Sequence, residues 1–372
     1  PRICRSGWAA RRRLSAEAAD LGQNGGREPA RAEVGMGMAT RSFGRTGLQV
    51  SPLALGTMEF GGKISEADAV GLLDVALDAG INMVDTANVY GGGVSEQIVG
   101  RLVAGRREQL LLATKFSVPT DAADPNTGGT SRRSVIAACE ASLRRLGTDY
   151  LDLYYVHRPF TQTAIDETLR ALDDLVHSGK VRSIGTSGFA GWQLVEALWC
   201  AHDLRLNRPV VEQTAYHLLD RRAERELVPA ALTHGTALTI WSPLAGGLLT
   251  GKYLAEAETT GARLSRDDAW GAKHFTAMAD QAVRALADLA GRCGVTLTAL
   301  SLAWTLQRPG VASLVLGPRS TQQLSDQLAA LEVTLEEDVL AEIDRIVPPG
   351  RATVPYYLDD DFADFRPHPY HW

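Results

Sequence analysis

The feature that most constrains the fold is an alternation of short strand-like runs with longer amphipathic stretches, which repeats eight times from residue 40 onward. The strand-like runs, rich in apolar and β-branched residues, are 52–56, 81–86, 110–116, 150–157, 181–187, 209–216, 238–243 and 313–317. The helical stretches that alternate with them are 65–79, 95–103, 132–146, 164–178, 192–202, 223–234, 279–292 and 297–307. A strand followed by its own helix, repeated eight times, predicts an α/β fold whose parallel strands close into a single (β/α)8 TIM barrel.

The alternative architecture is an open doubly wound sheet, which usually carries a glycine-rich phosphate loop after its first strand. The sequence has no G-x-G-x-x-G motif, and its nearest phosphate-loop pattern, Gly246 to Lys252, continues with Tyr253 where a magnesium-binding Ser or Thr is needed. The barrel is therefore the expected fold, with a long loop at 245–277 after the seventh strand and extra C-terminal helices near 321–331 and 336–346. A loop of this length in a compact domain usually forms a lid or a ligand-binding element.

The two ends of the chain differ in composition from the barrel. Residues 1–38 are rich in Arg, Ala and Gly and lack hydrophobic periodicity, so we expect a disordered N-terminal extension ahead of a natural start at Met36 or Met38. Residues 39–372 form the expected barrel domain. Residues 355–372 hold six of the 24 aromatic residues, which predicts a packed tail. Two roles stay open for it: closing a pocket or forming a contact in a homo-oligomer.

Charge and cysteine content exclude several classes of function. The net charge is −6, and no run of Lys or Arg occurs beyond the first few dozen residues, so the sequence lacks the basic surface of a nucleic-acid-binding protein. The four cysteines, at positions 4, 139, 200 and 293, are too scattered for a disulfide framework or a zinc site, which favours a reducing cytoplasm and no bound metal. No apolar run approaches the roughly 18 residues that span a bilayer, so no membrane partner is expected.

Four polar residues end or follow three neighbouring predicted strands. Asp85 closes the second strand and Tyr90 lies just beyond it, while Lys115 and His157 close the third and fourth strands. Because the catalytic residues of barrel enzymes come from the C-terminal ends of the strands, we expect these side chains to meet at one mouth. An ammonium group that ends an apolar strand needs a counter-charge, and Asp85 on the adjacent strand can supply it.

The chemistry of these residue types indicates a proton-donating site. A buried Lys–Asp pair by itself often has a structural role only, and a single His is more often a packed side chain than a functional one. The tyrosine changes this interpretation, because a nearby ammonium stabilises a phenolate and makes the phenol a better acid. Such an acid suits an oxygen that gains negative charge while hydride reaches a carbonyl carbon, a reaction that requires a bound dinucleotide.

Asp85, Tyr90, Lys115 and His157 resemble, in order and in context, the catalytic tetrad of the aldo-keto reductases. Further similar segments are 44–48 (GRTGL), 55–58 (LGTM), 85–91 (DTANVYG), 143–153 (LRRLGTDYLDL) and 241–244 (WSPL). The resemblance runs from about residue 41 to about 345 and is to the NADP-dependent branch of bacterial enzymes and channel β-subunits. It implies reduction of an aldehyde or ketone, in which Tyr90 gives the proton, Lys115 and Asp85 support it, and His157 orients the carbonyl.

The resemblance also implies a set of contacts with NADP. Trp241 corresponds to an aromatic ring that stacks on the nicotinamide, and Gln213 to an amide that fixes its carboxamide. Arg319 corresponds to a group that contacts a 2′-phosphate, which favours NADP over NAD. The other positions that line the cofactor in the family are Gly56, Thr57, Met58, Ser187, Ser242, Leu244, Gly246, Gly317, Gln323 and Gln327.

Several positions depart from the usual pattern of the family. Gly188 stands where an asparagine commonly binds the carboxamide, and Gln323 and Gln327 stand where Arg and Asn commonly flank the adenosine. We therefore expect the positive charge on the adenosine side to rest mainly on Arg319. Relatives that reduce carbon–carbon double bonds often carry glutamate at the position of His157, so the histidine favours a small carbonyl compound as substrate.

Two other functions would use the same residues. If Lys115 lost its proton it would form a Schiff base with a carbonyl substrate, as in barrel aldolases, although Asp85 opposes that loss. A redox-sensing subunit that binds NADP with little turnover is the second alternative. The identity of the substrate is not specified by the sequence. Its determinants are expected in the 245–277 loop, which contains Trp270, His274 and Phe275.

Overall fold

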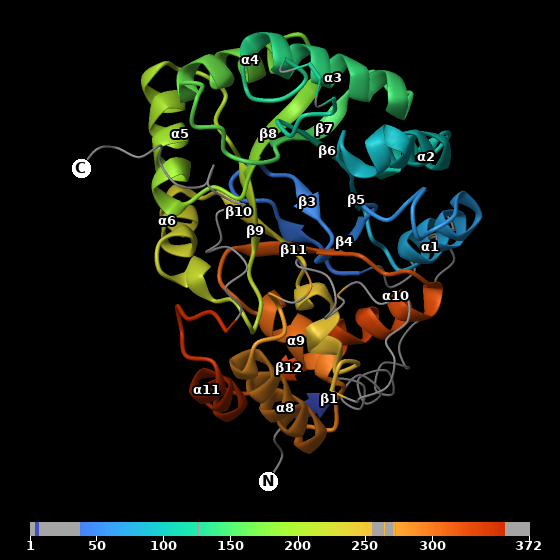
Figure 1. Cartoon of the computed structure of the whole chain (residues 1–372), viewed down its shortest axis with the longest axis vertical. Coiled ribbons are helices and arrows are strands. Elements are labelled where there is room, and N and C mark those ends of the chain that lie inside the picture. The colour runs from blue at the N-terminus through green and yellow to red at the C-terminus, as the bar shows by residue number, and fades with distance from the viewer. Residues whose placement is uncertain are drawn as a thin grey trace, which may run out of the picture.

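The computed structural model of the chain describes residues 4–6, 38–121, 123–124, 126–254, 264, 271 and 273–353 (Figure 1). Its centre is a closed barrel of parallel strands, and each strand lies where the sequence predicts one. In chain order the barrel strands are β4 (Leu53–Gly56), β5 (Met83–Asp85), β6 (Leu111–Phe116), β7 (Leu151–Val156), β8 (Val181–Ser187), β9 (Val211–Ala215), β10 (Ala237–Trp241) and β11 (Val311–Leu316). Each pairs with the next, and β11 pairs with β4, which confirms the predicted TIM barrel.

Helices surround the barrel and cover the outer face of its strands (Figure 1). The helices between successive strands are α1 (Glu66–Asp78), α2 (Val94–Val103), α3 (Arg132–Leu146), α4 (Ile165–His177), α5 (Gly191–Asp203), α6 (Leu227–His234), α8 (Ala277–Arg292) and α9 (Leu297–Leu306). The predicted C-terminal helices are present as α10 (Thr321–Leu328) and α11 (Glu337–Ile346). Local sequence sets their ends: Ser131 accepts a hydrogen bond from the Ser134 backbone at the start of α3, and Gly147 ends it at a φ of 63°.

One predicted helix is shorter in the structure than in the sequence analysis. The stretch 223–234 consists of a 3₁₀ turn, η3 (Arg222–Glu224), followed by α6, which begins only at Leu227. Pro229 explains the late start, because it has no backbone N–H and fits the first turn of a helix, where those groups have no partner within the helix. A helix that began at 223 would place this proline in its interior. In the same way, the predicted helix 321–331 is α10 followed by the 3₁₀ turn η5 (Ala329–Glu332).

A hairpin that the sequence analysis does not predict closes the N-terminal end of the barrel. Its strands are β2 (Arg41–Ser42) and β3 (Gln49–Val50). Phe43 and Val50 are fully buried and pack against the side chains that fill the N-terminal end of the barrel. These side chains are Ala54, Met83, Ala113, Leu153, Tyr155, Val211, Ala237 and Ala312. Because apolar residues fill this end, polar side chains can be collected only at the opposite end, where the strands finish.

Tyr155 is the largest side chain of this inner layer, and its packing dictates a glycine on the next strand. A Cβ atom at Gly185 would lie 2.7 Å from two ring carbons of Tyr155 and 2.6 Å from a methyl group of Val211. These distances are far below van der Waals contact, so Gly185 is required by the close packing of β7, β8 and β9. The strands beneath the site are therefore held in fixed positions.

The connection after the seventh barrel strand is long, as predicted, since β10 ends at Trp241 and α8 begins at Ala277. Its first part is not loop but a 3₁₀ segment, η4 (Ala245–Thr250), in which Gly246 and Gly247 have φ values of 66° and 100°. Trp270 lies outside the described residues, and so does the whole aromatic tail 355–372.

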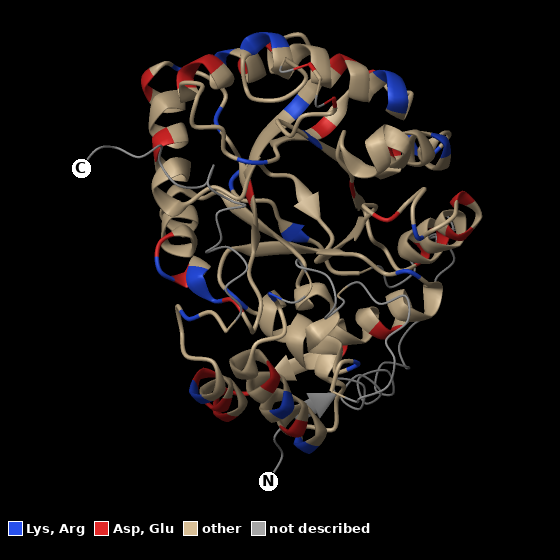
Figure 2. Cartoon of the chain, in the orientation of Figure 1, with Lys and Arg blue, Asp and Glu red and all other residues tan. Residues whose placement is uncertain are grey.

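At the other end, Cys4–Ser6 forms strand β1, which pairs antiparallel with β12 (Val333–Leu335). The rest of the expected extension up to residue 37 lies outside the described residues, so its disorder stays a prediction. Acidic and basic residues both occur along the outer helices (Figure 2), as on solvated helix faces. In the part of the chain that the structure describes, no single helix is long and apolar enough for a membrane span; only α8 and α9 together reach that length, and they bend by 94° at their junction.

Candidate active site

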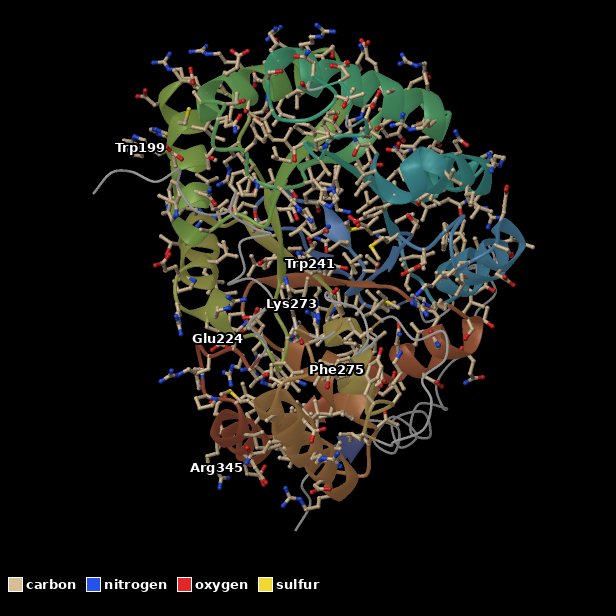
Figure 3. The ribbon with its side chains drawn as sticks, viewed as in Figure 1. Trp199, Glu224, Trp241, Lys273, Phe275 and Arg345 are labelled. Atoms are coloured by element: carbon tan, nitrogen blue, oxygen red, sulfur yellow. The ribbon has the colours of Figure 1, made fainter. Side chains whose placement is uncertain are left out.

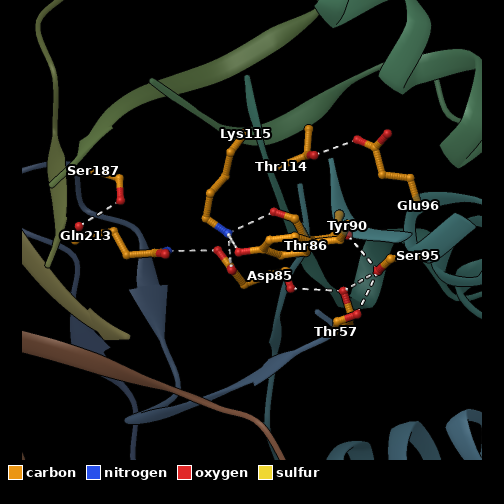
Figure 4. A network of polar contacts seen from close by, with 10 residues as sticks. All are labelled: Thr57, Asp85, Thr86, Tyr90, Ser95, Glu96, Thr114, Lys115, Ser187 and Gln213. Atoms are coloured by element: carbon orange, nitrogen blue, oxygen red, sulfur yellow. Dashed lines mark hydrogen bonds and ion pairs between the residues drawn. The ribbon is translucent and has the colours of Figure 1, made fainter. Parts of the chain in front are cut away.

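The four residues of the predicted tetrad meet at the C-terminal mouth of the barrel (Figure 4 shows three of them). Lys115 on β6 donates hydrogen bonds to the Asp85 carboxylate at the end of β5, to the Thr86 carbonyl at 2.9 Å and to the Tyr90 hydroxyl oxygen at 3.3 Å. His157 follows β7, and its ring meets the Tyr90 ring edge-on, with 5.8 Å between the ring centroids. The structure therefore brings together side chains from three neighbouring strands that are up to 72 positions apart in the sequence.

The backbone after β5 positions Tyr90. The Thr86 and Asn88 N–H groups donate to the carbonyls of Ala113 and Lys115, which extends the β5–β6 pairing beyond the end of the strand. Tyr90 then opens the 3₁₀ turn η1 (Tyr90–Gly93), in which Gly91 and Gly92 have φ values of 57° and 63°. Left-handed conformations at successive positions favour glycine, so this sequence turns the chain sharply and leaves the tyrosine partly exposed at the mouth.

Lys115 and Asp85 form a desolvated ion pair, with exposed fractions of 1% and 2%. Burial alone disfavours the ammonium, but the charges and hydrogen bonds of Asp85 and Tyr90 outweigh it, and the net effect is a raised pKa for Lys115. Lys115 therefore stays protonated at neutral pH. A fixed cation 3.3 Å from the Tyr90 oxygen stabilises negative charge there when the hydroxyl gives up its proton.

His157 is neutral at physiological pH. Its desolvation, followed by the positive charges of Lys115 and Arg158, lowers the pKa of the imidazole well below its usual range. A neutral imidazole has one N–H group, which can donate a hydrogen bond to a substrate oxygen. The buried Nδ1 atom of His157 has no hydrogen-bond partner among the described residues, so the ring retains unused hydrogen-bonding capacity at the mouth.

Gln213 on β9 makes a contact that the sequence analysis does not predict. Its side-chain amide donates to the second oxygen of Asp85 at 2.8 Å, and it is 2% exposed. Ser187, at the end of β8, donates from its hydroxyl to the Gln213 carbonyl at 2.9 Å. Both carboxylate oxygens of Asp85 therefore have donors, one from Lys115 and one from Gln213. The amide predicted to hold a carboxamide supports the Asp85 carboxylate in this structure, and its contact with a cofactor stays a prediction.

Thr57 is likewise part of a buried network. Its hydroxyl contacts the Ser95 hydroxyl at 2.9 Å and donates to the Asp85 carbonyl at 3.1 Å, while Ser95 also contacts Thr86 at 3.0 Å (Figure 4). These bonds join the loop after β4 to β5 and to the start of α2. Gly56 beside it is explained by packing, because a Cβ atom there would lie 2.7 Å from the Leu316 carbonyl oxygen on β11.

The remaining predicted cofactor residues lie on segments that follow β4, β10 and β11. Trp241, labelled in Figure 3, ends β10 and is half-buried. Ser242 follows it with a φ of 49°, which is uncommon for a residue with a side chain, and Leu244 then leads into η4 with Gly246. Met58 is 39% exposed after β4. Gly317, Arg319, Gln323 and Gln327 lie on the segment from β11 into α10, where the Gln323 side chain accepts a hydrogen bond from the Arg319 N–H at 2.9 Å.

Two observations on this rim fit a bound dinucleotide. Gln327 is 8% exposed, and its side-chain oxygen has no hydrogen-bond partner within the described residues. A Cβ atom at Gly317 would meet no atom within 4 Å, so open space adjoins the backbone there. An unsatisfied buried acceptor normally implies a missing partner, and open space beside a glycine permits close approach of a ligand. A group with hydrogen-bond donors, such as an adenine amine, fits these features.

The sequence model of the Aldo/keto reductase family matches residues 52–348, which is most of the chain. The chain belongs to this family. It is 40% identical over 328 residues to the uncharacterized oxidoreductase YrpG of Bacillus subtilis (strain 168), a match that covers 85% of this chain and 98% of that protein. It is 34% identical to probable voltage-gated potassium channel β-subunits of Arabidopsis thaliana, over 319 residues, and Oryza sativa subsp. japonica, over 325 residues. Each match covers 83% of this chain and 97% of the relative.

Membership confirms the resemblance seen in the sequence. Proteins of this aldo/keto reductase family are oxidoreductases that act on carbonyl groups and generally bind a nicotinamide cofactor.

The sequence analysis does not identify three residues near the site. Asn88 is 3% exposed between Asp85 and Tyr90, Glu59 lies beside Arg319, and Glu212 precedes Gln213. Each of them lies within or beside a motif that the sequence analysis uses, and this position is the signal that could have found them. Contacts between separate loops, however, cannot be predicted from the spacing of residues along the sequence.

Glu212 leads to a prediction about pH and stability. It is a fully buried residue of β9 and accepts a hydrogen bond from the Phe189 N–H at 3.0 Å, and desolvation raises the pKa of its carboxyl from 4.5 to about 8. Between these two values the unfolded chain binds fewer protons than the folded chain, so this group lowers stability as pH rises. We expect Glu212→Gln to remove that loss. Relative to the variant, the wild-type Tm should fall by roughly 2 °C per pH unit between pH 5 and 8.

Differential scanning calorimetry across this pH range measures the effect. Glu196→Gln is the matched control, because Glu196 is exposed on α5 and should give a constant difference in Tm. A Tm difference between wild type and Glu212→Gln that does not change with pH would contradict a protonated Glu212 carboxyl.

Proposed function

We propose that the chain is an NADPH-dependent reductase that converts a small aldehyde or ketone into an alcohol. The observation that carries this proposal is the contact of 3.3 Å between the Lys115 ammonium and the Tyr90 hydroxyl. Asp85 accepts a hydrogen bond from the same ammonium, and Gln213 donates to the other oxygen of Asp85. When bound, the nicotinamide supplies a hydride to the carbonyl carbon. The carbonyl oxygen then gains negative charge and needs a proton.

The chain's own residues provide that proton and position the oxygen. Tyr90 lies at the mouth and donates its hydroxyl proton to the developing alkoxide, while the positive charge of Lys115 stabilises the phenolate that remains. The N–H of neutral His157, whose ring contacts Tyr90, donates a hydrogen bond to the same oxygen and orients it. Trp241 would stack on the nicotinamide, and Ser242, Leu244 and Gly246 would lie along the pyrophosphate. Gly317, Arg319, Gln323 and Gln327 would hold the adenosine half of the cofactor.

The chemistry of Lys115 opposes the aldolase alternative. A Schiff base requires an unprotonated amine, whereas Asp85 and Tyr90 raise the pKa of Lys115 and the Thr86 carbonyl accepts a further hydrogen bond from its ammonium. We expect no covalent adduct with Lys115 when a carbonyl substrate is treated with borohydride. A trapped adduct, found by mass spectrometry in the absence of NADPH consumption, would favour the lyase.

A second candidate function is a redox-sensing subunit that binds NADP with little turnover. The 34% identity to probable potassium channel β-subunits supports it. The two functions differ in turnover, so the test is NADPH oxidation across a panel of aldehydes, ketones and quinones, repeated with NADH. Multiple turnovers with at least one carbonyl support the reductase. Tight NADPH binding with no turnover across the panel supports the sensor. The cytoplasmic setting expected from the scattered cysteines is part of the reductase proposal.

A further inference from the structure

An ion pair joins two loops on the adenosine side of the mouth. An Nη atom of Arg319 lies 3.8 Å from an Oε atom of Glu59, and the two side chains are 21% and 19% exposed. Arg319 follows β11 and directly precedes Ser320, the N-cap of α10, whereas Glu59 follows β4, the neighbouring strand in the barrel. The acid therefore reaches across from a different loop to the arginine that, in the proposed function, receives a 2′-phosphate.

The folded backbone fixes both partners. The Glu59 carbonyl accepts hydrogen bonds from the N–H groups of Gly62 and Ile64, at 3.1 and 3.0 Å, so the loop after β4 is a closed turn. The Arg319 N–H is held by the Gln323 side chain at 2.9 Å. Because each backbone is held by its own loop, the approach of the two side chains is a consequence of the fold, and a ligand that binds one of them must meet the other.

The two cofactors differ at this place by a single group. NADP carries a phosphate on the 2′-oxygen, and NAD carries a hydroxyl. Arginine matches the phosphate, whereas a carboxylate beside a ribose matches the hydroxyl, which can donate a hydrogen bond to it. A phosphate within reach of Arg319 also comes close to the negative charge of Glu59, and like charges in a partly buried setting repel. At 3.8 Å the ion pair is longer than a hydrogen-bonded contact, so Arg319 can exchange Glu59 for another anionic partner.

We propose that Glu59 is a specificity-determining residue for the cofactor. It competes with the 2′-phosphate for Arg319 and so reduces the factor by which NADP binds more tightly than NAD. This inference rests on the proposed function, because it requires a dinucleotide at the mouth with its adenosine near Arg319. Glu59 acts through its charge, so an amide of the same shape should remove the competition and keep the loop.

Isothermal titration calorimetry with NADP⁺, NAD⁺ and 2′,5′-ADP tests the proposal without reference to turnover. For Glu59→Gln we expect Kd to fall about tenfold for NADP⁺ and 2′,5′-ADP and to change less than twofold for NAD⁺. For Arg319→Leu we expect Kd to rise tenfold or more for NADP⁺ and little for NAD⁺. Glu66→Gln is the matched control, because it removes the acid of the Glu66–Arg101 surface pair between α1 and α2 and should leave all three Kd values unchanged.

Each outcome is decisive for the role of Glu59. Weaker NADP⁺ binding by Glu59→Gln would mean that the acid orients Arg319 for the phosphate, and the proposal would be wrong. An equal change for NADP⁺ and NAD⁺ would also overturn it, because no discrimination would be involved. If the amide lowers the Tm by more than a few degrees, Glu59→Ala tests the same expected Kd ratio. Failure of the wild type to bind either dinucleotide would instead overturn the proposed function.

Discussion

Replacement of Tyr90 by Phe is expected to lower kcat for carbonyl reduction by about 10³-fold, because general acid catalysis contributes about 10²–10⁴-fold and the described part of the chain places no other acid beside it. Desolvation lowers the pKa of His157 well below its usual range, so at pH 7 the imidazole is neutral and has no acidic imidazolium proton to give. The Kd for NADPH should change less than threefold, since the hydroxyl that is removed faces Lys115. Steady-state reduction of the best carbonyl from the panel, together with fluorescence titration of NADPH, measures both quantities.

Tyr150→Phe is the matched control for this experiment. Tyr150 precedes β7 at the far end of the barrel, where its ring packs against the guanidinium groups of Arg107 and Arg182. The same atom is removed, and turnover should stay within twofold of the wild type. Near-normal turnover in Tyr90→Phe would refute the assignment of the acid. An equal loss in both variants would point to a general effect on folding.

Replacement of Lys115 by Met is expected to abolish reduction and also to destabilise the fold by about 3–5 kcal/mol, because it leaves the buried Asp85 carboxylate without its cation. The side-chain amide of Gln213 would remain on one oxygen of Asp85, but a single neutral donor does not offset a buried charge. Urea denaturation followed by circular dichroism measures the stability, and NADPH oxidation measures the activity.

The double variant Lys115→Met/Asp85→Asn separates the two roles of the pair. Removing both charges removes the unpaired carboxylate, so most of the lost stability should return, whereas reductase activity should stay absent because Tyr90 has no cation beside it. Recovery of both stability and activity would show that Lys115 has a structural role only. Failure to recover stability would show that the pair is not the buried, mutually dependent unit that the structure indicates.

The barrel could be predicted because its determinants are local. The strand runs alternate with amphipathic helical stretches, and helices such as α3 carry local caps, Ser131 and Gly147, so the order of elements follows from the sequence. The hairpin of β2 and β3 could not be predicted in this way. Its strands have two residues each, and it is held by packing of Phe43 and Val50 against side chains from seven other strands, which no local pattern records.

The same distinction applies to the site. Asp85, Lys115 and His157 could be grouped because parallel strands finish at one edge, which makes position at a strand end a reliable guide to proximity. Side-chain direction could not be read from the sequence. Gln213 donates a hydrogen bond to Asp85, and Glu59 lies beside Arg319. Glu212 accepts a hydrogen bond from the Phe189 N–H. These contacts depend on which face of a strand or loop a residue occupies after the barrel has closed.

The central claim is that the Tyr90 hydroxyl, stabilised by the Lys115 ammonium, supplies the proton to the carbonyl oxygen. The most direct measurement is stopped-flow oxidation of enzyme-bound NADPH by excess aldehyde in a single turnover, in H₂O and in D₂O. We predict a slower step in D₂O for the wild type, and persistence of bound NADPH over at least 100 times the wild-type half-life in Tyr90→Phe. Oxidation by Tyr90→Phe at the wild-type rate, with the same solvent isotope effect, would contradict the claim.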